Sequence, residues 1–153
     1  MTRLILGQTL AFDADPFSTP PEDAARHSAH GAILMDGDRI AAVGEADALR
    51  AAHPDAQVED MGDALLVPGF VDCHAHYPQT AIIASWGRRL IDWLNNYTFP
   101  EESRFGDGAY ARTQAELYLD LCLANGITSA CVFSTIHPES VDAIFEAAQA
   151  RNM

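Results

Sequence analysis

The sequence of 153 residues is poor in basic side chains and in long apolar runs. Lys and Arg number 9 against 22 Asp and Glu, which gives a formal net charge of −13. An acidic surface of this kind repels phosphate backbones and anionic lipid, so we expect neither nucleic acid nor a membrane as a partner. No apolar stretch reaches the ~18 residues of a membrane span, and residues 1–7 lack the apolar core of a signal peptide.

Cysteine is scarce as well. Cys73, Cys122 and Cys131 are too few and too scattered for a disulfide framework, which predicts a reducing, cytoplasmic location. They do not form the Pro-Cys-x-x-Cys arrangement of the cytidine-deaminase type of zinc enzyme, so that fold is a poor match. With 48% hydrophobic and 20% charged residues, the chain has the composition of one globular domain or two small pieces.

The first 65 residues have a β-rich pattern. Asp36-Gly37-Asp38 lies between two apolar runs, which is a strong hairpin signal. Prolines, Asp and Ser mark residues 13–23 as a loop. The other elements predicted here are strands over 3–12, 29–35, 39–43 and 57–61 and a short helix over 46–52.

The remaining residues alternate between apolar strands and helices. The apolar runs 65–72 and 127–133 predict strands that are buried on both faces. Helices are expected over 80–86, 89–97 and 107–125, with a last helix that begins at Pro138. Such alternation is typical of parallel strands joined by crossover helices, so the predicted fold class is α/β.

The clearest functional signal is the run Pro-Gly-Phe-Val-Asp-Cys-His-Ala-His, which ends at His76. Because side chains alternate along a strand, His74 and His76 are expected on one face, where two imidazoles can share a divalent metal. Asp72 lies two residues before His74, so its side chain is expected on the same face of the strand. There it could orient a histidine or act as a further ligand. His-x-His also occurs by chance on surfaces, but the end of a buried strand is where parallel barrels place their active sites.

This run resembles the first barrel strand of the amidohydrolase superfamily, whose members use a metal-dependent (β/α)8 barrel and often begin with a small β-sandwich. Within the superfamily, the stretches 74–79, 93–102 and 125–140 resemble the guanine deaminases. The resemblance implies that residues 1–65 belong to the β-sandwich domain. It also implies that residues 66–153 are the first βα units of an incomplete (β/α)8 barrel.

The resemblance also implies a reaction. In the family, zinc lowers the pKa of a bound water towards ~7, the water attacks C2 of guanine, and xanthine and ammonia are the products. His74 and His76 match two zinc ligands, and Gln79 matches a residue that contacts the purine. A carboxamide suits this role because it both donates and accepts hydrogen bonds. Without the resemblance, an exposed polar loop residue is the better interpretation of Gln79. Many relatives are dimers, so the resemblance leaves a homodimer open, although the sequence does not define the oligomeric state.

The sequence departs from the family pattern because it lacks the other zinc ligands and the catalytic glutamate. Two further histidines, an aspartate and the catalytic glutamate come from later barrel strands, and a full barrel needs ~250 residues. His137 does not match a zinc ligand and is expected to be structural or part of the pocket wall. We therefore expect the amino-terminal part of a guanine deaminase, with no catalytic residue of its own and no activity alone.

Two alternatives stay open. One is another amidohydrolase, such as a chlorohydrolase or a deaminase of a different purine or pterin, although the aromatic stretch 93–102 favours guanine deaminase. The other is a non-catalytic, truncated module that binds zinc or a partner. Trp93, Tyr97 and Phe99 could line a purine pocket or belong to the core, and Cys73 is expected to be buried.

Overall fold

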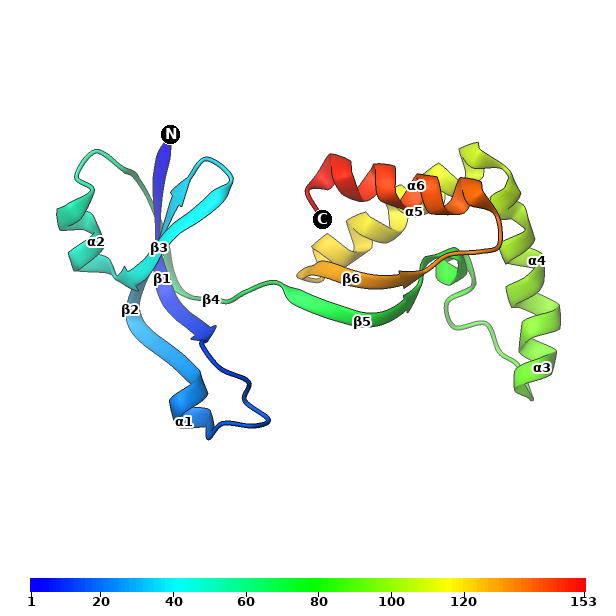
Figure 1. Ribbon diagram of the computed structural model, residues 1–153, viewed down its shortest axis with the longest axis horizontal. Helices are drawn as coiled ribbons and strands as arrows, with labels where there is room; N and C mark the ends of the chain where they lie inside the picture. Colours follow the sequence, from blue (N-terminus) through cyan, green and yellow to red (C-terminus); the bar gives the residue numbers. More distant parts are fainter. The chain divides into compact units, whose positions relative to one another are not determined.

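A computed structural model describes all 153 residues and divides into two compact units, Met1–Pro68 and Gly69–Met153 (Figure 1). The boundary expected from sequence, after residue 65, lies just before this division. No helix in the structure is both long and apolar enough to cross a membrane.

The first unit is a four-stranded sheet with the strand order β3-β2-β1-β4. β1 pairs with β2 and β2 pairs with β3, both antiparallel, whereas β1 and β4 are parallel. Two short helices complete the unit. The element bounds are β1 Thr2–Phe12, α1 Pro21–Ala24, β2 Ala25–Asp36, β3 Arg39–Glu45, α2 Ala46–Ala52 and β4 Gln57–Leu66.

Local signals explain most of this unit. Gly37 takes a positive φ of 63° in the tight turn between β2 and β3, which confirms the predicted hairpin. Alternate residues of β1 and β2 point into a small core made of Leu4, Leu6, Ala32 and Leu34. The predicted helix over 46–52 is confirmed as α2. The loop over 13–23 was predicted too long, because α1 begins at Pro21.

In the second unit, two parallel strands carry helices along one side (Figure 1). β5 and β6 pair with each other, and the long helices α5 and α6 pack together. Short helical turns form the connection from β5 to α5. The bounds are β5 Phe70–His76, a 3-10 turn Tyr77–Ile82, α3 Leu90–Trp93, a π turn Leu94–Thr98, α4 Phe99–Glu102, a 3-10 turn Ser103–Gly106, α5 Gly108–Ala124, β6 Ile127–Phe133 and α6 Pro138–Arg151.

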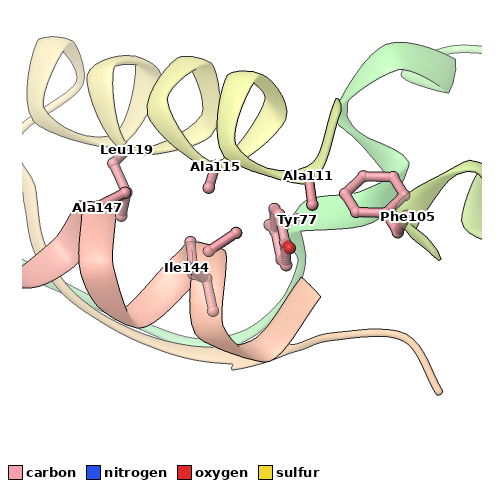
Figure 2. Packing of buried hydrophobic residues seen from close by; sticks show 8 residues of the cluster. Tyr77, Phe105, Ala111, Ala115, Leu119, Ile144 and Ala147 are labelled. Atoms are coloured by element: carbon pink, nitrogen blue, oxygen red, sulfur yellow. The ribbon is translucent and has the colours of Figure 1, made fainter. Parts of the chain in front are cut away.

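The core of this unit lies between α5 and α6, as Figure 2 shows. Small side chains on α5 let the two helices approach closely, and Tyr77 packs edge-on against Phe105 at one end. Asp107 caps α5 by accepting hydrogen bonds from the backbone N–H groups of Ala109 and Tyr110. The buried members are Tyr77, Phe105, Ala111, Ala115, Leu119, Ala143, Ile144 and Ala147.

The predicted helix over 107–125, strand over 127–133 and helix from Pro138 are confirmed. The single strand predicted over 65–72 is wrong: β4 ends at Leu66 and β5 begins at Phe70. Pro68 lies in the break, and it has no N–H to donate to a strand ladder. The helix predicted over 80–86 is also wrong, because a 3-10 turn ends at Ile82.

The prediction that both apolar strands are buried on both faces is wrong for this structure. Phe70 is 60% exposed and Val71 is 66% exposed, and Phe133 at the end of β6 is 49% exposed. Half-buried residues of the two strands lie on the side that the helices cover.

Candidate metal and purine site

Two imidazoles converge at the carboxyl end of β5. The Nε2 atoms of His74 and His76 lie 3.2 Å apart. Two nitrogens at ~2.05 Å from one tetrahedral zinc would lie about 3.3 Å apart. The donor pair therefore fits two positions of a single zinc ion. No group of three or more His, Cys, Asp or Glu side chains comes together in this structure.

Phe133 packs against both imidazoles. Its ring stacks on that of His76, with centroids 4.7 Å apart and planes 11° apart, and lies 5.0 Å from the ring of His74. The contact arises because His76 and Phe133 are register partners at the ends of two parallel strands. An aromatic face in this place limits the rotation of the imidazoles. Sequence reasoning missed Phe133, because only strand pairing brings it to the histidines.

Asp72 lies in the same strand as the histidines and lines the same cavity as His76. The pairing of β5 with β6 is irregular between Asp72 and Ala75, which align with Ala130 and Val132 on the helix side. A register irregularity of this kind interrupts the regular alternation of side chains. The Asp72 carboxylate accepts a hydrogen bond of 3.0 Å from the backbone N–H of His74. It therefore contacts the backbone of His74 and neither imidazole.

Gln79 lies in the 3-10 turn that follows β5, and its side chain is half-buried. Its Nε2 donates a hydrogen bond of 3.1 Å to Oε1 of Glu102. A cavity of about 570 Å³ is lined by Gln79 together with His76, Asp72, Trp93, Tyr118 and Cys122, among others. The structure therefore brings one histidine of the pair and the expected purine contact to the same cavity.

Tyr118 contributes a phenol to this cavity that the sequence did not single out. Its hydroxyl is buried beside the Cys122 thiol. Burial raises the pKa of Tyr118 well above its usual range, and the neighbouring Cys122 and Asp72 raise it further. The phenol is therefore neutral at ordinary pH. Tyr118 lies on α5, far along the chain from the histidines, and no local motif marks it.

A buried carboxylate anchors the helical turn that carries Glu102. Glu101 is 7% exposed and accepts hydrogen bonds from the Tyr110 hydroxyl and, at 2.9 Å, from Arg104. The Arg104 guanidinium also lies 3.8 Å from the centre of the Tyr110 ring. Burial, together with the negative charge of Glu101, raises the pKa of Tyr110 to about 12. These contacts hold α4 in place and so position Glu102.

The structure also places the other residues that were considered from sequence, which are His137, Trp93, Phe99 and Cys73. His137 precedes α6; its N–H donates to Thr135 Oγ1, and its carbonyl accepts from the Ser140 hydroxyl. Trp93 lines the cavity and donates to Ser85, whereas Phe99 is 52% exposed and belongs to no core. Cys73 is exposed, so its predicted burial is wrong.

Two parts of the chain match known protein families. Residues 65–153 match the model of the amidohydrolase family. Residues 31–56 match an imidazolonepropionase-like composite domain of bacteria. Since the first match spans more than half of the sequence, the chain belongs to the amidohydrolase family, and its mixed α/β structure has amidohydrolase neighbours.

Several similar proteins are guanine deaminases. The guanine deaminase of Escherichia coli (strain K12) is 42% identical over 87% of this chain and 31% of that protein. The crystal structure of guanine deaminase from Bradyrhizobium japonicum superposes with a TM-score of 0.92 and 34% identity, over 100% of this chain and 34% of that one. Guanine deaminase from C. acetobutylicum with bound guanine gives a TM-score of 0.77 and 26% identity, over 95% and 33%. The chain spans about a third of the length of these relatives.

Proposed function

We propose that these residues form the amino-terminal third of a zinc-dependent guanine deaminase, which converts guanine and water to xanthine and ammonia. The observation that carries this proposal is the 3.2 Å convergence of His74 and His76 at the end of β5, with Gln79 beside His76 in one cavity. The similarity to guanine deaminases, one of them solved with bound guanine, supports this substrate over others.

The proposal extends to the architecture. Residues 1–65 contribute to a small β-sandwich domain, and residues 66–153 supply the first βα units of a (β/α)8 barrel. The parallel pair β5 and β6, with α5 and α6 along one side, supports the second assignment. In a barrel of this kind the active site lies at the carboxyl ends of the strands, where His76 is found.

Each residue of the site has a role in this proposal. His74 and His76 hold the zinc through neutral Nε2 atoms, and Phe133 keeps both rings in place. Bound zinc supplies a water of lowered pKa and a positive charge near the reacting carbon. The remaining ligands and the proton-transferring carboxylate lie outside these residues. Asp72 supports the metal site only indirectly, by holding the backbone N–H of His74.

Gln79 binds the purine in this proposal. Its side chain is half-buried in the wall of the cavity, where a hydrogen bond to a ligand is protected from water. Trp93 and Ile82 add apolar surface that suits a flat heterocycle. Tyr118 also lines this wall, with its hydroxyl buried beneath the cavity surface.

The test is ammonia release by the zinc-loaded, full-length protein that contains these residues, with guanine, adenine, a pterin and a chlorinated triazine as substrates. We expect turnover of guanine above all others. Turnover of another substrate without guanine would assign a different amidohydrolase, and stable zinc binding with no turnover would assign a non-catalytic module. The homodimer and the cytoplasmic location stay predictions.

A further inference from the structure

We propose that Glu102 is a positioning residue that fixes the orientation of the Gln79 carboxamide and so selects a purine edge that donates N–H groups. This inference rests on the proposed function. It starts from one contact: Gln79 Nε2 donates to Glu102 Oε1 at 3.1 Å, between two half-buried side chains that are 23 positions apart in the sequence.

The chemistry of the pair permits one orientation of the amide. The two ends of a glutamine side chain have nearly the same shape, so packing alone does not decide which end faces where. A carboxylate accepts hydrogen bonds and donates none, so the NH₂ end of Gln79 must face Glu102. The amide oxygen is then the end left for a ligand. No protein donor contacts Oε1 of Gln79, and this atom is not sealed from the cavity.

Glu102 is suited to hold this position because its neighbour is anchored. Glu101, the preceding residue of α4, is fixed by Tyr110 and Arg104. Arg104 pairs with Glu101, and no salt bridge reaches Glu102. Glu102 therefore keeps its full acceptor strength for Gln79, and its uncompensated charge also favours a ligand that donates. Guanine offers such donors at N1 and at the 2-amino group, beside the carbon that reacts.

Single substitutions of Glu102 and Gln79 test this arrangement. In Glu102→Gln the carboxamide of Gln79 can take either orientation, because the new side chain can both donate and accept hydrogen bonds. We expect the KM for guanine to rise about tenfold while kcat changes less than about twofold, the split of a binding interaction. Gln79→Glu places two carboxylates face to face, and we expect it to reduce kcat/KM about 100-fold. Zinc content should stay constant in all variants.

The exchange variant Gln79→Glu/Glu102→Gln restores the arrangement with reversed polarity. The amide introduced at position 102 donates to the carboxylate introduced at position 79, which keeps an acceptor oxygen for the ligand. We expect the double variant to recover about tenfold or more over Gln79→Glu alone, as a double-mutant cycle would show. The rise of KM at nearly constant kcat, rather than this rescue, separates a role in orienting substrate from a role in folding. The matched control is Glu116→Gln, the same change of charge at an exposed position of α5, which should alter nothing.

The outcomes separate the two proposals. If the unaltered protein releases no ammonia from guanine, the proposed function fails and the role of Glu102 falls with it. If the unaltered protein is active and Glu102→Gln keeps its KM, or the exchange variant is no better than Gln79→Glu, only the role of Glu102 is overturned. Loss of zinc in Glu102→Gln would also overturn it, because the residue would then be structural.

Discussion

The Nε2 atoms of His74 and His76 lie 3.2 Å apart on one face of β5. This distance is close to the ~3.3 Å that two imidazole nitrogens take on one tetrahedral zinc. Both donors therefore lie where a shared ion would need them, and the proposed binding would require little reorganisation. Strand alternation sets the common face, and the Phe133 ring limits the motion of both side chains.

Removing either imidazole should release the metal. In the full-length protein, His74→Ala or His76→Ala should lower the zinc content from about one equivalent to near zero and abolish turnover of guanine, because the remaining ligands bind too weakly. Metal analysis after gel filtration measures this. His53→Ala, an exposed histidine of the first unit, is the control and should keep its zinc. A His74→Ala/His76→Ala double variant with zinc and activity would disprove the ligand assignment.

Phe133 should act on metal affinity without touching the metal. Phe133→Ala removes the face that stacks on His76, so the imidazoles gain rotational freedom, and the affinity for zinc should fall about tenfold. Phe133→Leu should lower the affinity for zinc less, since leucine keeps apolar bulk beside the imidazoles. Competition with a chromophoric chelator measures the affinity. Phe145→Ala, on the exposed side of α6, should leave it unchanged, and an equal loss in both variants would show that the effect is not local.

Gln79 should affect the substrate more than the metal. Gln79→Ala in the full-length protein should keep zinc near one equivalent. It should raise the transition-state free energy by about 1–3 kcal/mol, because a buried hydrogen bond to the purine is lost. Steady-state kinetics with guanine give this value. Kinetics identical to those of the unaltered protein would mean that the side chain does not reach the substrate.

The buried phenol of Tyr77 should couple stability to alkaline pH. Its hydroxyl donates to the backbone carbonyl of Ser140 at 2.5 Å, and burial raises the pKa of Tyr77 to about 12. In the unfolded chain the phenol ionises near pH 10, so the free energy of unfolding falls as pH rises from about 10 to 12. Below pH 10 this contribution is constant.

Tyr77→Phe removes both the hydrogen bond and this titration. At pH 8 the variant should be less stable by about 1 kcal/mol. At pH 11 the difference between the variant and the unaltered protein should shrink, because only the unaltered protein is destabilised by ionisation of Tyr77. Thermal midpoints of both proteins at the two pH values test this. The comparison cancels the contributions of the other tyrosines, and a difference that stays constant with pH would refute the account.

Local signals in the sequence predicted much of the fold. Asp36-Gly37 specified the hairpin of β2 and β3, and Asp107 marked the start of α5, because turns and caps depend on neighbouring residues. The common face of His74 and His76 followed from strand alternation. The break after Leu66 was missed, since an apolar run can continue through two strands that belong to different units.

Contacts between distant segments could not be predicted in the same way. The irregular pairing of β5 with β6 leaves Asp72 in contact with the backbone of His74, and nothing in the local pattern of β5 signals it. Phe133 and Tyr118 reach the site only through the packing of later elements. The contact between Gln79 and Glu102 depends on how the helical turns fold back, which the linear spacing does not contain.

The 153-residue chain alone leaves apolar surface uncovered. Phe70 is 60% exposed, Val71 66% and Phe145 71%, and β5 and β6 pair only with each other. Open strand edges and apolar patches favour association with other chains. Two imidazoles also make only half of a tetrahedral zinc site. We therefore expect the isolated chain to be oligomeric and to bind zinc weakly, as light scattering and metal titration would show.

Ammonia release from guanine, measured side by side for the zinc-loaded full-length protein and for the 153-residue chain, tests the central claim most directly. The account predicts turnover by the full-length protein, its loss in His74→Ala, and none by the shorter chain. Full-length protein that holds zinc but releases no ammonia from guanine would contradict the proposed function. Turnover by the shorter chain at the full-length rate would contradict the claim that the site needs further ligands.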